Sequence, residues 1–451
     1  MKEARTEVRK KLLVLAAPIV IQNLLSSAVN SMDVIMLNFV GQDAISAVSL
    51  AAQVANVLFM ILYGAGTGAT MLNAQYYGKG DIEAVKVVQG IAMRFSLGAA
   101  ALVAAAAFFL PEAVMRIFTD DAALVTLGAQ YLRIVGVAYL CWGVIEVYLS
   151  VLRSIGRVNV SMGLNVLAFS LNILLNAGFI FGWFGLPKMG IAGVALATSL
   201  SRVVELIGCL IVSAGSEIKL DLRYMLIRNK VLFDDFIKMA LPAIFNDVVW
   251  GLAFTLYSVV LGHLGSDAVA ANSLGSVVRN FGSVLCFGMS SATGIAVGQT
   301  IGEGDENKAR LAASEALRLT FLSCAIGGAI ILCVTPFVLR FADLSEMALH
   351  YLKYMLLINS VYIFGGGVNT TLIVGVIRAG GDSRFGLIVD MIDMWVYALP
   401  LAFLNAFVFK LPVLWVYLFM CTDEFVKWPW VFRHYFSGKW LKNITRDNWN
   451  S

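Results

Sequence analysis

The chain is 451 residues long, 59% of them apolar and only 14% charged, and its mean hydropathy is +0.82. A soluble core cannot hide this much apolar surface, so the composition excludes a soluble globular protein and predicts a polytopic membrane protein. The net charge of +4 is interpreted as a signal of membrane topology and makes no case for a nucleic-acid partner.

Long apolar stretches predict twelve transmembrane helices, because about 20 apolar residues in a helix span a bilayer. In chain order they are 12–40, 44–76, 87–110, 123–152, 159–182, 189–214, 238–264, 268–300, 311–337, 346–377, 386–408 and 412–432. The short alternating segments of a β-barrel do not occur. The sequence therefore predicts an all-α fold: an N-terminal lobe of six helices (1–214), a connector (215–237), and a C-terminal lobe of six helices with a short tail (238–451).

Basic residues predict the orientation of these helices, since Lys and Arg favour cytoplasmic loops. Five of them precede the first span, between residues 2 and 11, and others fall in alternate loops, including the basic connector. The sequence therefore predicts an inner or plasma membrane protein, embedded in the lipid bilayer, with both termini and the connector in the cytoplasm. The charged N-terminus leads into a long span without a small-residue cleavage site, so we expect no cleaved signal.

The two halves of the chain repeat. Residues 17–86, shifted by 224 positions without a gap, align with 241–310. The identical positions include polar and loop residues in addition to apolar ones. They include the pairs Gly41/Gly265, Asp43/Asp267, Asn56/Asn280, Gln75/Gln299, Gly78/Gly302, Gly80/Gly304 and Asp81/Asp305. Repeated halves favour a transporter, because many carriers bind substrate at the interface of two such units.

Four features resemble the multidrug and toxic compound extrusion (MATE) family. They are the first span from Pro18 to Met36, the loop Gln75–Asp81 with its second-half copy, the pattern Asn172–Asn176, and the turn Arg378–Arg384. The resemblance implies the MOP-superfamily fold, with two pseudo-symmetric six-helix lobes forming a V around a central cavity. It also implies drug export driven by an inward flow of H⁺ or Na⁺.

Asp33 is the main candidate for the coupling ion, because a carboxylate within a span is costly unless it faces the bundle or a wet cavity. It lies about 10 Å below the outer surface at 1.5 Å per residue. Asn176 and Thr198 fall at a comparable depth, and Asn172 lies one turn below Asn176 on the same face. These oxygens could hold a monovalent cation or adjust the pKa of a protonatable Asp33. Alternatively, Asp33 makes a structural contact with a neighbouring helix, and the asparagines only form hydrogen bonds between helices. The resemblance supports Asp33, Asn172 and Thr198, although one branch of the family can carry an acid at Asn176.

Asp390 and Asp393 in the span 386–408 are candidates for a second ion or substrate site, because residues at i and i+3 share a helix face. The alternative is that they pair with basic residues near Arg378 and Arg384. Asp247 is a further candidate in the C-terminal lobe. It is displaced from the acid that sodium-coupled relatives carry, which aligns near Trp250.

Other intramembrane residues have more ordinary interpretations. Pro18 removes a backbone hydrogen bond and can kink the first span, and the resemblance suggests that bending there couples protonation of Asp33 to substrate release. An internal salt bridge is favoured over a role in transport for three further charged residues within the spans, Glu146, Glu205 and Arg94.

The leading hypothesis is an antiporter that works as a monomer and exports small organic cations in exchange for H⁺ or Na⁺. The alternatives are a flippase of a lipid-linked precursor, disfavoured because basic residues are nearly absent from the spans of the first lobe, and an exporter of a narrow endogenous metabolite. Motifs for enzymatic catalysis and ATP hydrolysis are missing, and the six cysteines show no spacing typical of metal ligands. We therefore expect no enzyme activity, no cofactor and no bound metal, apart from a monovalent cation at Asp33.

Overall fold

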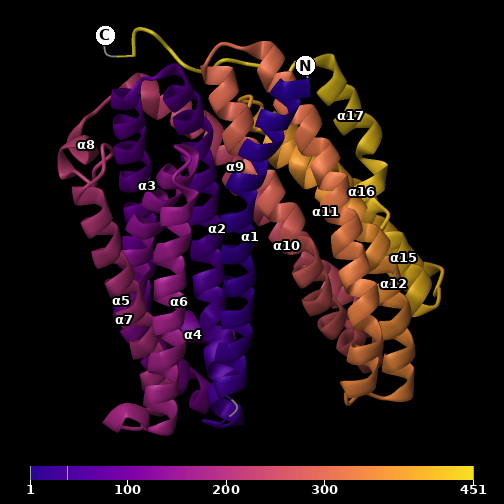
Figure 1. Cartoon of the computed structure of the whole chain (residues 1–451). Helices are drawn as coiled ribbons and strands as arrows, with labels where there is room; N and C mark the ends of the chain where they lie inside the picture. Colours follow the sequence, from indigo (N-terminus) through magenta and orange to yellow (C-terminus); the bar gives the residue numbers. More distant parts are fainter. Residues whose placement is uncertain (1, 38, 450–451) are drawn as a thin grey trace. The chain divides into compact units, whose positions relative to one another are not determined.

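The structure, a computed structural model, describes residues 2–37 and 39–449. Within these ranges the side chains at 2, 30, 31, 33–35 and 184 are not described. The described chain is helical and divides into two compact units (Figure 1). We call Ile21–Ile244 with Arg446–Ser451 the N-terminal unit, and Met1–Val20 with Phe245–Thr445 the C-terminal unit.

Helices lying wholly in the N-terminal unit are α2 (Gln42–Lys79), α3 (Ile82–Phe109), α4 (Pro111–Arg116), α5 (Ala122–Ser154), α6 (Val158–Phe181), the 3₁₀ turn η1 (Trp183–Gly185), α7 (Gly190–Ala214) and α8 (Leu222–Leu226). Those of the C-terminal unit are α10 (Ser266–Gly302), α11 (Glu306–Phe341), α12 (Glu346–Asn369), α13 (Ser383–Met391), α14 (Leu399–Phe403), α15 (Val413–Met420), α16 (Asp423–Val426) and α17 (Trp428–Ser437), with the π-helical turns η2 (Thr370–Ile377), η3 (Ile392–Ala398) and η4 (Leu404–Val408). Two long helices, α1 (Lys2–Leu37) and α9 (Lys230–His263), run from one unit into the other.

The all-α membrane fold is confirmed. Eleven helices in the described chain are long and apolar enough to span a membrane. The twelfth predicted span, 412–432, is interrupted and consists of α15, α16 and the start of α17. Asp423, Glu424 and Lys427 lie at the interruption, and Pro429 stands in the first turn of α17, where its missing N–H costs no helical hydrogen bond.

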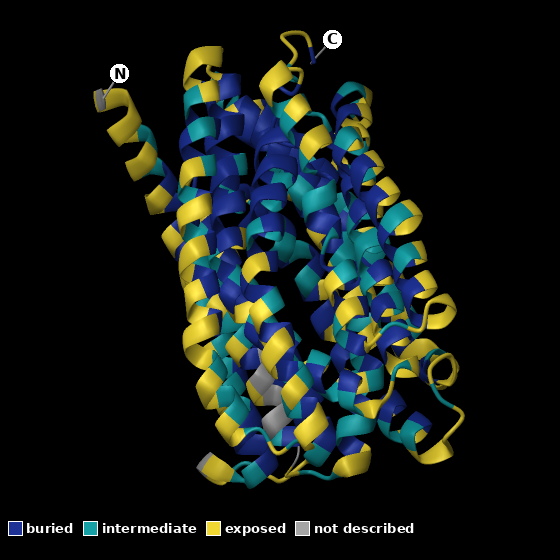
Figure 2. Ribbon diagram, turned by 90° about the vertical axis from the view of Figure 1, so that its right-hand side faces the viewer, coloured by how far each residue is buried: buried dark blue, intermediate teal, exposed yellow. Residues whose placement is uncertain are grey.

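Large apolar side chains cover the outside of the long helices. Leu102 and Phe109 on α3, Ile211 on α7 and Val396 on η3 are each more than 65% exposed. Exposed and buried positions alternate along the long helices of the molecule (Figure 2). A soluble protein rarely exposes so much apolar surface, whereas lipid tails solvate it.

The sequence repeat has a structural counterpart in the loops. Gly80 and Gly304 both adopt the left-handed conformation, with φ of 83° and 79°, which a residue with a Cβ rarely adopts. The next residues, Asp81 and Asp305, each cap the following helix by accepting a hydrogen bond from a backbone N–H three residues later, at 3.0 and 2.9 Å. The repeated Gly-Asp pair therefore ends one helix and begins the next in both units.

The points at which α1 and α9 change units are equivalent in the repeat. The N-terminal part of α1 belongs to the C-terminal unit as far as Val20, and that of α9 belongs to the N-terminal unit as far as Ile244. Pro18 and Pro242 lie inside these helices, each two residues before the change. Because proline removes an intrahelical hydrogen bond, each helix has a weak point next to the boundary.

Glycines let these exchanged segments approach closely. A Cβ at Gly64 of α2 would lie 2.5 Å from the Ile244 side chain and 2.8 Å from its Cα. A Cβ at Gly288 of α10, the repeat partner of Gly64, would lie 2.3 Å from the Val20 side chain. Small residues at such crossings are typical of membrane helix packing.

We predict that Gly64→Val destabilises the protein by about 1–3 kcal/mol, the usual cost of overpacking. The new side chain would collide with the Ile244 backbone, which cannot move aside like a flexible side-chain end. Gly98→Val is the matched control, because a Cβ at Gly98 of α3 has no neighbour within 4 Å. Unfolding of both variants in mixed micelles measures the difference, and equal stabilities would contradict the close crossing.

The C-terminal tail docks on the N-terminal unit. Arg446 makes two hydrogen bonds to the Asp235 carboxylate, at 2.6 and 2.7 Å, and Lys79 lies 2.5 Å from the Asp447 carboxylate. The Trp449 indole donates to Asp81 at 2.7 Å and is buried. The tail is thus held on the repeated Gly-Asp loop.

We predict that Arg446→Ala releases the tail, because Asp235 loses its bidentate partner. Chymotryptic cleavage after Trp449, followed by intact mass, should become several-fold faster. Lys442→Ala, which removes an ion pair to Asp382 in the C-terminal unit, should leave the rate unchanged. An unchanged rate in Arg446→Ala would show that the tail does not depend on this contact.

The tail contact should also weaken in acid. The hydrogen bond from Lys79 lowers the pKa of Asp447 below its ordinary value. A carboxyl group with a lowered pKa stabilises the tail contact fully at a pH above its ordinary pKa. This stabilisation is lost as the pH falls through the lowered pKa. Anisotropy of a fluorophore at the tail should therefore fall only in this acidic range, and less so in Asp447→Asn, which lacks the titrating group.

Candidate functional site

Lys427 is at the centre of a cluster of buried charges in the C-terminal unit. Its Nζ donates to Asp390 Oδ1 at 3.0 Å and lies 3.1 Å from Glu424 Oε2 and 3.6 Å from Asp393 Oδ2. All four side chains are buried. Asp390 and Asp393 come from α13 and η3, whereas Glu424 and Lys427 come from the interrupted twelfth span. The interruption therefore places a lysine against the two aspartates.

Asn246 and Arg378 extend this cluster toward Asp247. The second carboxylate oxygen of Asp390 accepts a hydrogen bond from Asn246 Nδ2 at 2.9 Å. Asn246 Oδ1 in turn accepts one from Arg378 Nη2, and this guanidinium lies 3.6 Å from Asp247 Oδ1. The three acids that the sequence singled out in this half thus belong to one network. Asp390 pairs with Lys427, a base outside the expected region near Arg378 and Arg384.

The cluster has more carboxylates than bases. Asp423 lies beside Glu424, whose backbone N–H donates to Asp423 Oδ1 at 2.7 Å. Four of these acids, Asp247, Asp390, Asp393 and Glu424, form ion pairs with only two bases among the described residues, Arg378 and Lys427. Asp423 adds a fifth acid without an ion pair there, so the five acids exceed the two bases by three negative charges if every acid is ionised. Burying unpaired charge costs several kcal/mol per ion. The cluster is therefore suited to hold protons or a cation.

Several oxygens of the cluster are available to a bound ion. Within the described chain, both carboxylate oxygens of Asp393, Oδ2 of Asp423 and Oδ2 of Asp247 have no hydrogen-bond partner. The Asn369 side-chain amide donates to Glu424 Oε2 at 2.7 Å. Two π-helical turns, η2 after Asn369 and η3 around Asp393, flank these groups, whereas α5 and α6 of the other unit are uninterrupted. Such turns are frequent at functional sites.

The structure brings together three of the four residues predicted at the first-lobe site. Asn176 Nδ2 donates to Asn172 Oδ1 at 3.2 Å, and Asn172 Nδ2 donates to Thr198 Oγ1 at 3.4 Å. Both asparagines are buried. Asp33 lies on α1, and its side chain is outside the described residues.

Glu146 and Glu205 make internal salt bridges, as the sequence favoured, but with partners it did not name. Arg153 Nη2 lies 3.0 Å from Glu146, and Arg202 Nη1 lies 2.6 Å from Glu205. Arg94 makes neither of these pairs. Both acids are thus neutralised locally.

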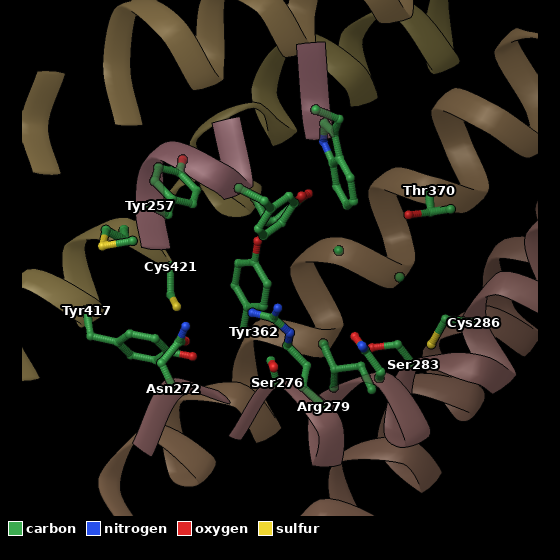
Figure 3. A pocket seen from close by; sticks show the side chains of 18 of the residues that line it. Tyr257, Asn272, Ser276, Arg279, Ser283, Cys286, Tyr362, Thr370, Tyr417 and Cys421 are labelled. Atoms are coloured by element: carbon green, nitrogen blue, oxygen red, sulfur yellow. The ribbon is translucent and has the colours of Figure 1, made fainter. Parts of the chain in front are cut away.

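A cavity of about 400 Å³ opens beside the charged cluster within the C-terminal unit (Figure 3). Aromatic side chains of α9 line it, together with polar side chains of α10, among them Arg279. Glu424 belongs both to the lining and to the Lys427 cluster. The volume is within the range of small-molecule sites.

Sequence reasoning missed Lys427, Glu424, Asp423 and Arg279. A signal existed for each, because ionisable residues inside a span are functional candidates by default. Asp423 and Glu424 precede Lys427 by four and three residues, the spacing of helical ion pairs. The repeat also points to Arg279, because the equivalent residue of the first half, 224 positions earlier, is the uncharged Ala55.

Comparisons with known proteins agree with this architecture. The profile of the MatE family matches residues 18–177 and 242–404, two segments whose starts differ by the repeat shift of 224. The chain is 26% identical over 450 residues to the probable multidrug resistance protein NorM of Thermotoga maritima, with 99% of this chain and 96% of the relative covered. A multidrug resistance MATE family transporter of the MOP superfamily, solved in an outward-facing conformation, superposes with a TM-score of 0.86 at 21% identity, covering 95% of this chain and 96% of that one. A MATE protein solved in a straight conformation superposes with a TM-score of 0.86 at 21% identity, with the same shares covered. The chain therefore belongs to the MatE family of membrane transporters.

Proposed function

We propose that the chain is a secondary active efflux transporter that exports small organic compounds, organic cations among them, in exchange for H⁺ or Na⁺. The observation that carries this proposal is the excess of buried carboxylates around Lys427, which favours the binding of protons or a cation. Relatives named as multidrug resistance proteins support efflux, including PmpM of Pseudomonas aeruginosa, which is 21% identical over 397 residues. The mechanism requires no cofactor.

The proposal includes two coupling sites. In the N-terminal unit, Asp33 binds the ion with Asn172, Asn176 and Thr198 as polar partners. In the C-terminal unit the ion binds in the Lys427 cluster, which lines the cavity through Glu424. Binding a proton replaces a charge by a neutral acid, and so changes which conformation is favoured. Pro18 and Pro242 provide flexible points where α1 and α9 change units.

The protein acts as a monomer in the plasma membrane with both termini in the cytoplasm. The alternate basic loops support this orientation. The docked tail agrees with it, since it contacts the basic loop between α2 and α3.

Purified protein in liposomes tests the proposal. Efflux of ethidium is followed under a pH gradient without Na⁺, and under an Na⁺ gradient at equal pH, for the parent and for Asp33→Asn. We expect flux under one gradient, which identifies the ion, and its loss in the variant. Folded parent protein without flux under either gradient would contradict the proposal and favour a lipid-linked precursor or a narrow endogenous metabolite as substrate.

A further inference from the structure

One face of α10 gives the cavity a polar wall with a positive charge. Asn272, Ser276, Arg279 and Ser283 follow one another at spacings of four, three and four residues, which places them on one side of the helix. The side chains of Asn272 and Ser283 make no hydrogen bond within the described chain and remain available to a ligand. Figure 3 shows these four residues around the cavity.

Aromatic rings surround the Arg279 guanidinium. Its Cζ lies 5.7 Å from the ring centres of both Phe254 and Tyr362. Within the described part of the chain, no carboxylate lies within 4.0 Å of it. Cation–π contacts offset only part of the cost of removing an arginine from water. The guanidinium can therefore still bind an anion.

The nearby acids do not fill this role, because neither contacts Arg279 among the described residues and the one that lines the cavity, Glu424, has other partners. Glu424, which lines the cavity, is held by Lys427 at 3.1 Å and by Asn369 at 2.7 Å. Asp423 accepts a backbone hydrogen bond from Glu424 and is not part of the lining. Of the described residues that line the cavity, Arg279 is thus the one with a positive charge. No carboxylate in the described chain contacts it.

We propose that this cavity binds an aromatic organic anion, with its carboxylate or sulfonate on Arg279 and its rings against Trp250, Phe254 and Tyr362. Arginine offers two parallel N–H donors to a carboxylate, and Asn272 and Ser283 can donate further hydrogen bonds. The inference rests on the proposed function insofar as the bound compound is a transported substrate. It extends the substrate range beyond the cations expected from the sequence.

Equilibrium binding to protein in nanodiscs, without any ion gradient, tests the site. The probes are 2-naphthoate, its neutral isostere 2-naphthamide, and the cation 2-naphthylmethylammonium, titrated by calorimetry. Naphthoate should bind about ten-fold or more tightly than naphthamide, the usual worth of a hydrogen bond to a charged group. Arg279→Met should weaken naphthoate binding far more than naphthamide binding and so remove this preference, and Arg279→Lys should retain part of it. Arg133→Gln is the matched control, since Arg133 pairs with Glu112 on the exposed surface of the other unit.

Retained naphthamide binding shows that Arg279→Met is folded. The inference is overturned if the parent binds naphthoate no tighter than naphthamide, if it prefers the cation, if it binds none of the probes, or if the preference survives in Arg279→Met. Since no gradient is used, failure of ion-coupled export would appear in the ethidium assay alone. A positive naphthoate result with no ethidium flux would retain the binding site and reject the proposed function.

Discussion

Asp393→Asn is expected to reduce gradient-driven transport to the background of protein-free liposomes, whereas Asp390→Asn is expected mainly to destabilise the fold. The two aspartates are three residues apart and both contact Lys427, but their other contacts differ. Asp390 is anchored by hydrogen bonds to both Lys427 and Asn246. Neither oxygen of Asp393 has a hydrogen-bond partner in the described chain. Asp393 is therefore the group that can take up and release an ion without dismantling the network.

Two measurements separate these roles. Unfolding in mixed micelles should show a loss of roughly 1.5–3 kcal/mol for Asp390→Asn, the usual worth of a hydrogen bond to a charged group, and a smaller loss for Asp393→Asn. Ethidium flux should show the reverse order. Asp120→Asn, at an exposed acid between α4 and α5, serves as the control. Full coupled flux in Asp393→Asn would remove this residue from the ion pathway.

The regular parts of the fold followed from local sequence. Apolar length predicted the spans, and the repeat predicted matched loops such as Gly80-Asp81 and Gly304-Asp305. The sequence could not predict that the first part of α1 belongs to the C-terminal unit and the first part of α9 to the N-terminal unit. Each of these helices carries one continuous apolar span in the sequence. Their change of unit depends on packing between distant residues, such as Gly64 against Ile244.

The candidate site was only partly predictable, for a similar reason. Asp390 and Asp393 were identified as acids within a span, but Lys427 lies 34 residues beyond Asp393 in a stretch whose Trp and Phe residues conceal its charges from a hydropathy average. The cluster forms only because the twelfth span breaks between α15 and α17. An i, i+3 or i, i+4 search for charges inside spans would have found Glu424, Asp423 and Lys427, but not their contact with Asp390.

Lys427→Met is expected to cost about 3–5 kcal/mol of unfolding free energy, the usual penalty for leaving a buried charge without its partner. Lys427 contacts three buried carboxylates, and no other base among the described residues contacts Asp393 or Glu424. Lys353→Met is the matched control, because Lys353 is exposed on α12.

A second substitution separates electrostatics from packing in this prediction. If Lys427→Met destabilises through unpaired negative charge, adding Glu424→Gln should restore part of the stability, because the double variant buries one carboxylate fewer. If Lys427 acted only as a bulky side chain, the two costs would add. Residues in contact typically show coupling energies of about 0.5–3 kcal/mol, so unfolding of the two single variants and the double variant in mixed micelles resolves the alternatives. Additive losses would show that the excess of carboxylates is not what makes Lys427 necessary, and would remove the main support for an ion-binding cluster in the C-terminal unit.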